Sequence, residues 1–286
     1  MLQVLEGWQE AIPAPWQETL EGDVFDWGAP ALDIADDHVD YPAYPPLHGH
    51  QGGPGLFRPF RGIGPENVRV VVVAQDPYPD RERATGRAFE DWSVGQQQEL
   101  GGSLKRLLQS AITCKYPGII PDQNDEGWRH IRDRAAPHLP DREAMTGYFD
   151  DLAQEHGVLF LNAAWTFTPV AGEPEAEEKR RRRERTQRAH RALWKPAMQR
   201  LIKNQAARDQ PTVFLLLGDA SQGLLSGWDG VWRQSALVQN AHPAAPGRYF
   251  HADYINPLRR ANEMLVHLGE EEVDWWPFPN GEPNEL

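Results

Sequence analysis

Short runs that are apolar at nearly every position constrain the fold of this chain more than any other feature. They occupy residues 68–74, 157–161 and 212–217, and a fourth β-rich run occupies residues 235–239. Continuous apolar character is expected when helices cover both faces of a parallel sheet, whereas a strand with one exposed face alternates apolar and polar residues. The sequence therefore predicts an α/β fold, a three-layer α/β/α sandwich with a central four-stranded parallel sheet.

Helical patterns lie between these runs. Gly101, Gly102 and Ser103 have the character of a loop and an N-cap, and apolar residues at helical spacing follow them. Further helices are predicted at residues 148–156 and at about residues 175–203. Pro196 lies inside the last stretch and is expected to break it into two helices, because proline lacks an N–H group and clashes with the preceding turn.

Length and hydrophobicity set the class of protein. The chain has 286 residues, of which 40% are hydrophobic, so we expect one domain that spans residues 1–286. Its longest apolar runs are far shorter than the roughly 20 residues that cross a bilayer. The N-terminus has no basic region followed by an apolar stretch, so no secretory signal is expected. These features favour a cytoplasmic protein with no membrane partner.

The cysteine and histidine residues of the sequence do not predict a metal site. Cys114 is the only cysteine, which excludes an internal disulfide and a cysteine-based zinc site. His48 and His50 form an H-x-H pair without a third ligand nearby, which favours a polar loop over a metal site. We expect neither a metal nor an organic cofactor.

Charge is distributed unevenly along the chain. The formal net charge is -13, but residues 1–50 contain ten acids and residues 269–286 contain six, with no Lys or Arg in either segment. The middle, residues 51–268, therefore carries +3 and suits a phosphate partner better than the ends do. We expect an acidic N-terminal wrap over about 1–56, a catalytic core over about 57–268 and an acidic C-terminal tail over about 269–286.

Polar residues follow each predicted strand. Gln75-Asp76-Pro77-Tyr78 follows the first run, Asn162 the second, Gly218-Asp219 the third, and His242-Pro243 comes shortly after the fourth. Ligands of open parallel sheets bind beyond the carboxyl ends of the strands, so these groups are expected to converge. Singly, Asp76 suits a turn, Asn162 a cap and His242 a core position. Neither a G-x-G-x-x-G nor a Walker loop follows the first run, which argues against a nucleotide-binding enzyme.

These motifs resemble the first family of the uracil-DNA glycosylase superfamily. The Q-D-P-Y motif at 75–78 is followed at the family's spacing by Ala84, Gly86 and Phe89. The runs that end at Asn162 and Gly218, the His242-Pro243 loop and a closing segment through Trp275 resemble the family's later motifs, in order, from about residue 7 to 276. The resemblance implies the α/β/α fold and hydrolysis of the N-glycosidic bond of uracil in DNA, which leaves an abasic site for base excision repair.

The resemblance also implies roles for individual residues. Asp76 stabilises the cationic sugar and positions or deprotonates the attacking water, and a neutral His242 donates a hydrogen bond to O2 of the departing base. Gln75 contributes backbone contacts to the base, and Asn162 reads its O4 and N3–H edge. Phe89 stacks on the flipped base, and Tyr78 presses against C5 and rejects thymine.

The chain departs from the family at the residues that grip DNA. Pro79 stands where the family has His. In the family, a segment with two serines and a wedge leucine follows the His-Pro pair, and this chain has Ala244 to Gly247 in its place, without either serine or the leucine. Asp219 stands where a phosphate-contacting Ser is usual. Ser103, Pro246 and Arg248 remain as the predicted DNA contacts. If a wedge exists, the candidates are Arg248, Tyr249 and Phe250.

Several interpretations stay open at this point. The basic run at residues 179–185 either replaces the lost phosphate contacts or is a solvated helix face. The substrate is uracil in single- or double-stranded DNA, or a modified pyrimidine in foreign or phage DNA, which would indicate defence. A third alternative is a non-catalytic DNA- or base-binding module. DNA is the expected partner, and we expect a monomer.

Overall fold

A computed structural model describes residues 11–20, 43–44, 53–80, 83–92, 100–116, 118–119, 142–168, 177–227, 232–250 and 255–278. The strands are β1 (Ala43–Tyr44), β2 (Gly53–Pro54), β3 (Val70–Ala74), β4 (Val158–Asn162), β5 (Thr212–Leu217) and β6 (Ser235–Asn240). The helices are α1 (Gln17–Leu20), α2 (Gly102–Lys115), α4 (Arg142–Gln154), α5 (Glu177–Ala206), α6 (Asp219–Gln222), α7 (Pro246–Tyr249) and α8 (Pro257–His267). The predicted acidic wrap lies largely outside these residues, as do His48 and His50.

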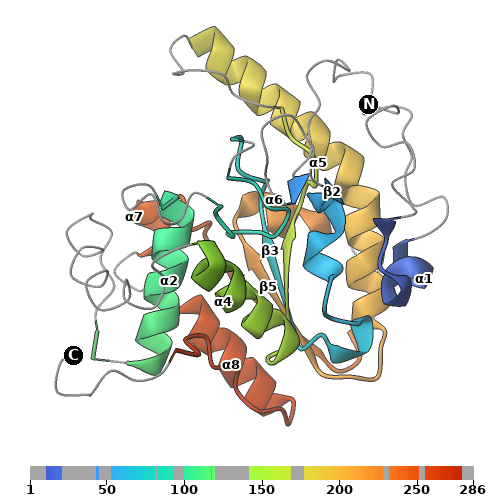
Figure 1. The fold of residues 1–286 in the computed structure, drawn as a ribbon, viewed down its shortest axis with the longest axis vertical. Coiled ribbons are helices and arrows are strands. Elements are labelled where there is room, and N and C mark those ends of the chain that lie inside the picture. Colours follow the sequence, from blue (N-terminus) through green and yellow to red (C-terminus); the bar gives the residue numbers. More distant parts are fainter. Residues whose placement is uncertain are drawn as a thin grey trace.

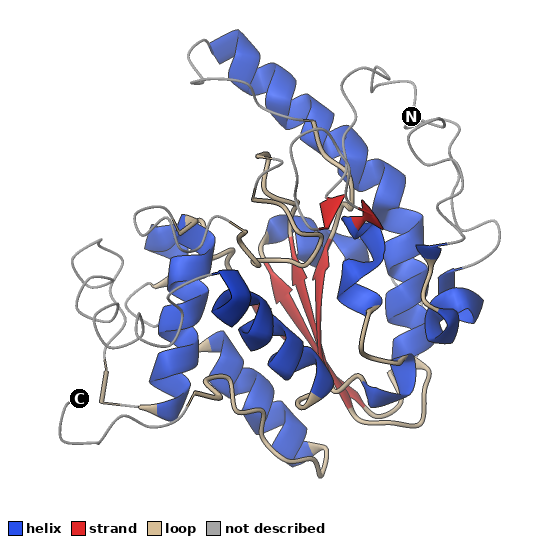
Figure 2. Cartoon of the chain, in the orientation of Figure 1, coloured by secondary structure: helices blue, strands red, loops and turns tan. Residues whose placement is uncertain are grey.

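The central sheet has four parallel strands in the order β4-β3-β5-β6. Figure 2 shows the strands running in one direction, with helices on both sides. The three runs that were predicted as continuous apolar strands form β3, β4 and β5, and every residue of these strands is buried. The predicted α/β fold with a four-stranded parallel sheet is therefore confirmed.

Alternate side chains of the strands enter two separate cores. Val71 and Val73 pack with α5 and the segment at Gly55–Phe60, whereas Val70 and Val72 pack with α2, α4 and α8. The strand period of two residues thus sends successive side chains to opposite faces. Figure 1 shows the resulting three layers, with α5 on one side of the sheet and α2, α4 and α8 on the other.

Helix α5 runs without interruption through Pro196, so the predicted break into two helices is wrong. Pro196 is exposed, and Leu193, Trp194, Ala197 and Met198 around it are all buried against the sheet. Burial of these side chains outweighs the roughly 3 kcal/mol cost of an internal proline. In Figure 1, the N-terminal half of α5 extends past the carboxyl ends of the strands.

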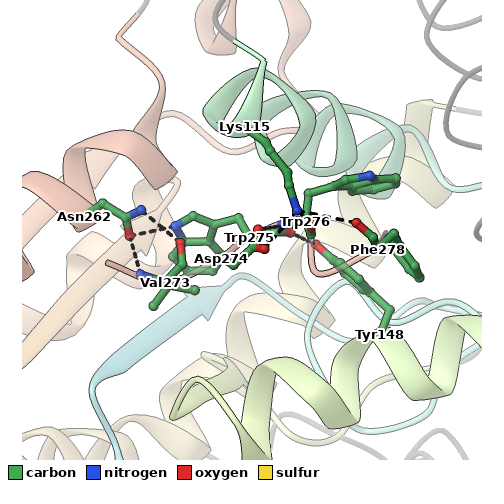
Figure 3. A network of polar contacts seen from close by, with 8 residues as sticks. All are labelled: Lys115, Tyr148, Asn262, Val273, Asp274, Trp275, Trp276 and Phe278. Atoms are coloured by element: carbon green, nitrogen blue, oxygen red, sulfur yellow. Dashed lines mark hydrogen bonds and ion pairs between the residues drawn. The ribbon is translucent and has the colours of Figure 1, made fainter. Parts of the chain in front are cut away.

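The chain after α8 belongs to the core. Trp275 and Trp276 are 2% and 4% exposed, so the hydrophobic core extends beyond residue 268. Figure 3 shows how Asn262 holds this segment. Its side-chain amide donates to the carbonyl of Val273 and accepts from the backbone N–H of Val273 and the indole N–H of Trp275. Lys115 donates to Asp274 at 2.9 Å and to the carbonyl of Trp276 at 2.6 Å. These contacts join α2, α8 and the final described turns.

Two observations bear on the expected class of protein. No helix among the residues that the structure describes is long and apolar enough to cross a membrane. Within the same residues, no group of three or more His, Cys, Asp or Glu side chains is arranged to hold a metal ion.

Candidate active site

A cavity of about 230 Å³ lies beyond the carboxyl ends of β3 and β4. Backbone bonds from Ala163 to Ala74 and from Ala164 to Gln75 keep the two strand ends side by side. The cavity is lined by residues 74–79, Ala84, Thr85, Gly86, Arg87, Phe89, Ser103, Asn162, Gln187, His242 and Ala244. It therefore contains every predicted catalytic and base-binding residue, and also Ser103.

Asp76 lies two residues after the end of β3, and its side chain is 10% exposed. Its Oδ2 atom accepts hydrogen bonds from Nη1 of Arg191 at 2.8 Å and from Nε2 of Gln75 at 3.1 Å. A poorly exposed carboxylate needs such partners, because burial disfavours its charge. The sequence did not single out Arg191, which lies 115 residues from Asp76 on a helix with many other arginines.

His242 follows β6 and faces the same cavity. Burial lowers the pKa of its imidazole to about 4, so the ring is neutral at pH 7. Its Nδ1 accepts the backbone N–H of Ala244 at 3.0 Å, which places the ring proton on Nε2. The resemblance implied a neutral ring at this position, and Nε2–H is the donor that such a ring has left.

Gly218 allows His242 to take this position. Its φ is +101°, and a Cβ at this residue would lie 2.7 Å from Cβ of His242. A larger residue would be strained at this φ and would collide with the histidine. The glycine between β5 and α6 therefore permits the close approach of the histidine loop.

Aromatic side chains form much of the remaining wall. The Phe89 ring lies 5.8 Å from that of His242, and Phe89 has a φ of +67°, an unusual value for a bulky residue. The hydroxyl of Tyr78 donates to the carbonyl of Phe89 at 3.3 Å. Burial raises the pKa of this hydroxyl well above its ordinary value, and Asp91 adds to the effect, so Tyr78 is a neutral wall residue. Asn162, at the end of β4, is only 3% exposed.

A buried ion pair supports the loop that carries Phe89. Arg58 donates to both carboxylate oxygens of Glu90, at 2.6 and 3.0 Å, and Thr85 donates to the same group at 2.8 Å. Gly86 has a φ of +103°, and a Cβ there would lie 1.9 Å from the carbonyl oxygen of Gly55. Only glycine fits at this point, which explains its place in the motif.

The structure separates the predicted wedge candidates. Tyr249 is fully buried, with its hydroxyl 3.0 Å from that of Ser110, and Phe250 is 5% exposed. Both belong to the core, so neither ring is presented to DNA and these two predictions are wrong for this structure. Arg248 is exposed, at the end of α7, which begins at Pro246.

Arg248 and Asp219 form an ion pair that the sequence did not predict. The two side chains are joined by two hydrogen bonds, at 3.1 and 3.2 Å, and both are largely exposed. The pairing lowers the pKa of the Asp219 carboxyl through its hydrogen bonds to Arg248. A lone carboxylate at this position would repel phosphate, but Asp219 has the cation of Arg248 beside it.

Helix α5, which lies outside the motifs named above, also contributes to the cavity. Gln187 lines the cavity, and Arg191 lies one helical turn further along. Arg181 and Arg185, in the basic run, are exposed. The helix thus contributes to the cavity at one end of its basic segment.

Comparison with known proteins agrees with this arrangement. A family model described as the Uracil DNA glycosylase superfamily matches residues 61–266. The uracil-DNA glycosylase of Mycolicibacterium vanbaalenii is 27% identical over 274 residues, which cover 94% of this chain and 94% of that protein. The uracil-DNA glycosylase of Thermobifida fusca is 27% identical over 271 residues, which cover 93% and 97%. The wild-type UNG crystal structure from Nitratifractor salsuginis has the same fold, with a TM-score of 0.55 at 19% identity over 96% of this chain and 95% of that one.

Proposed function

Because the chain belongs to the uracil DNA glycosylase superfamily, we propose that it is a monofunctional DNA glycosylase that removes uracil from DNA by hydrolysis. The observation that carries the proposal is the convergence of Asp76, Asn162 and His242 on one cavity at the carboxyl ends of the strands. Each of these side chains has an ordinary structural role when it stands alone. Together they supply the three groups that the reaction needs.

The reaction separates charge. When the bond between C1′ and N1 breaks, its electron pair leaves with the base, and the sugar takes on oxocarbenium character. The anionic Asp76 stabilises this cation and orients a water molecule. The water oxygen forms a bond to C1′, and a water proton passes to the Asp76 carboxylate. The departed base anion then takes up a proton while Asp76 releases to solvent the proton that it accepted, so the products are free uracil and an abasic site.

His242 acts on the opposite charge. Because Nδ1 accepts from Ala244, Nε2–H is the remaining donor of a ring that lines the cavity. We assign it to the O2 atom of uracil, where negative charge accumulates. A neutral donor suits this position because it keeps its proton throughout the reaction.

The cavity walls select the base. Asn162 offers one acceptor and one donor to the O4 and N3–H edge of uracil. Phe89 stacks on the flipped ring, Tyr78 closes the space beside C5, and Gln75 contributes backbone contacts. No lysine lies among the described residues that line the cavity, which favours water as the nucleophile over a lyase mechanism.

DNA contacts are proposed both at the wall of the cavity and outside it. Ser103 lines the cavity, and Arg248 lies exposed on α7, which begins at Pro246. An exposed ion pair contributes little to stability, so Arg248 can exchange Asp219 for a DNA phosphate at low cost. We also propose a cytoplasmic monomer with DNA as its partner and without a metal or organic cofactor.

The test uses the purified protein and labelled oligonucleotides that each carry one uracil, thymine, cytosine or 5-hydroxymethylated pyrimidine, single- and double-stranded. Abasic sites are scored by alkali cleavage. We expect cleavage at uracil, and a loss of several orders of magnitude in Asp76→Asn with an unchanged unfolding temperature. Asp209→Asn, an exposed carboxylate before β5, serves as the matched control and keeps full activity.

The alternatives give different results in the same assay. Cleavage at the 5-hydroxymethylated base alone would replace repair by a defence role, with Pro79 beside Tyr78 as the first place to look for the change. Binding without cleavage at any base would indicate a non-catalytic module. Full activity of Asp76→Asn would contradict the proposed mechanism.

A further inference from the structure

One face of α5 takes part in the pocket. Gln187 lines the cavity, and Arg191, one turn later, reaches Asp76 with an Nη1 to Oδ2 distance of 2.8 Å. The side chains of Arg191 and Asp76 are 24% and 10% exposed. Asp76 lines the cavity and Arg191 contacts it from α5, so this pair is largely shielded from solvent, unlike the exposed pair of Arg248 and Asp219.

Hydrogen bonds to the segment after β4 hold the helical turn that carries Arg191. The ring of His190 lies 2.9 Å from the hydroxyl of Thr166 and 3.0 Å from that of Thr168. Trp194 donates to the same Thr166 hydroxyl at 2.7 Å. All of these contacts lead to the segment that directly follows Asn162, so the backbone of Arg191 is tied to the strand that ends at Asn162.

The contact determines how the Asp76 carboxylate is held. Arg191 and Gln75 both donate to Oδ2, which restricts rotation of the carboxylate group. An opposite charge at this distance favours the ionised form of a poorly exposed carboxyl. A fixed and ionised carboxylate requires no reordering when the transition state forms.

We propose that Arg191 is a positioning residue of the glycosylase reaction, which holds the Asp76 carboxylate ionised and in one orientation. This inference rests on the proposed function. Arg191 acts through Asp76 and is not itself assigned to the substrate. The role belongs to α5, an element that none of the recognised motifs includes.

The experiment measures single-turnover release of uracil at saturating enzyme between pH 5 and 9. The proteins are the wild type, Arg191→Gln, Arg191→Lys and Lys195→Gln, and the last removes one positive charge from α5 a turn further from the cavity. We expect Arg191→Gln to be about 10- to 100-fold slower than wild type. The acidic limb of its pH–rate profile moves to higher pH, because the carboxylate loses its cation.

The lysine variant separates charge from geometry. Arg191→Lys keeps the positive charge, so its profile stays where the wild-type profile lies while only part of the rate returns. Lys195→Gln keeps the wild-type rate and profile. Unfolding temperatures of all four proteins exclude a general loss of structure.

Failure of the two proposals can be told apart. A wild-type protein that releases no uracil contradicts the proposed function. An active wild type with an Arg191→Gln variant of equal or higher saturated rate overturns the role of Arg191. A variant that binds product DNA more weakly but keeps the saturated rate also overturns it, since Arg191 would then be a DNA contact.

Discussion

At the scale of single residues, two histidines combine burial with hydrogen bonds that suit a neutral ring. His190 is 1% exposed, and both of its ring nitrogens face threonine hydroxyls. Burial lowers its pKa to about 4, and the neighbouring Arg191 adds to the effect. His242 has the same low value, also through burial. The folded state therefore favours the neutral form of both rings, in which each imidazole carries a single ring proton.

This preference predicts acid sensitivity. The folded-state pKa of His190 lies below its ordinary value of about 6.5, so the unfolded chain binds more protons and stability falls as pH drops from about 6.5 to 4. The loss that His190 contributes reaches up to about 3 kcal/mol at the acid end of this range. Urea unfolding at pH 7 and pH 4.5 measures it in the wild type and in His190→Gln.

The variant is expected to be less stable at pH 7, because it loses ring contacts, but to lose less between the two pH values. His267→Gln, at an exposed position in the last turn of α8, keeps the wild-type acid response. An equal acid loss in His190→Gln and wild type would show that other groups cause the sensitivity.

The sequence predicted residues that follow strands and missed residues that reach the site from a helix. Asp76, Asn162 and His242 were predictable because parallel strands end at a common edge. Arg191 was not, since its contact with Asp76 depends on where the turn at His190 is anchored. The pairing of Arg248 with Asp219 was missed for a similar reason: it joins the short helices α7 and α6, whose approach depends on the sheet.

At the scale of elements, α5 shows how tertiary packing overrides a local signal. Its proline predicted two helices, but the turns on either side bury large apolar residues, and one helix forms. The start of α2 shows a smaller difference. The N-cap is Gly101, so Ser103 lies inside the helix, and a Cβ at residue 101 would lie 2.8 Å from the Tyr78 side chain.

The N-terminal half of α5 also carries a basic stripe, defined as Arg181, Arg185 and Arg188. These residues are exposed and lie four and three positions apart, so they share one helix face. Replacement of all three by Gln is expected to weaken DNA binding and to reduce the slope of log affinity against log salt by up to about 0.9 per lost phosphate contact. Fluorescence anisotropy over a salt series measures the slope.

Three other cations of α5, Lys195, Arg200 and Lys203, provide the matched control. Their replacement by Gln removes the same charge from the C-terminal half of the helix. If both triple variants lower the slope equally, the effect comes from net charge and the basic stripe is only a solvated face.

At the scale of the whole molecule, the final described turns complete the core between the sheet and helices α2, α4 and α8. The amide of Asn262 makes three hydrogen bonds, of 3.0, 3.1 and 3.0 Å, to the segment at Val273 and Trp275. Tyr148 of α4 donates to the carbonyl of Trp275 at 3.0 Å. This segment joins α2, α4 and α8 although it has no regular secondary structure itself.

Asn262→Ala is therefore expected to lower the free energy of unfolding by about 2–4 kcal/mol, because it leaves buried backbone and indole groups without their partner. Glu263→Ala, the next residue on the exposed face of α8, is expected to change it by less than about 1 kcal/mol. Urea unfolding measures both. A loss below 1 kcal/mol in Asn262→Ala would mean that water replaces the amide.

The order of the strands along the chain also governs when activity can arise during synthesis. The ribosome adds about 5–20 residues per second, and the chain up to β4 is made long before β6. An unfinished chain holds Asp76 and Asn162, but it lacks His242 and the closing turns at Trp275 and Trp276. Under the proposed mechanism, a fragment that ends before His242 lacks one of the three groups that the reaction needs, and we expect it to be inactive.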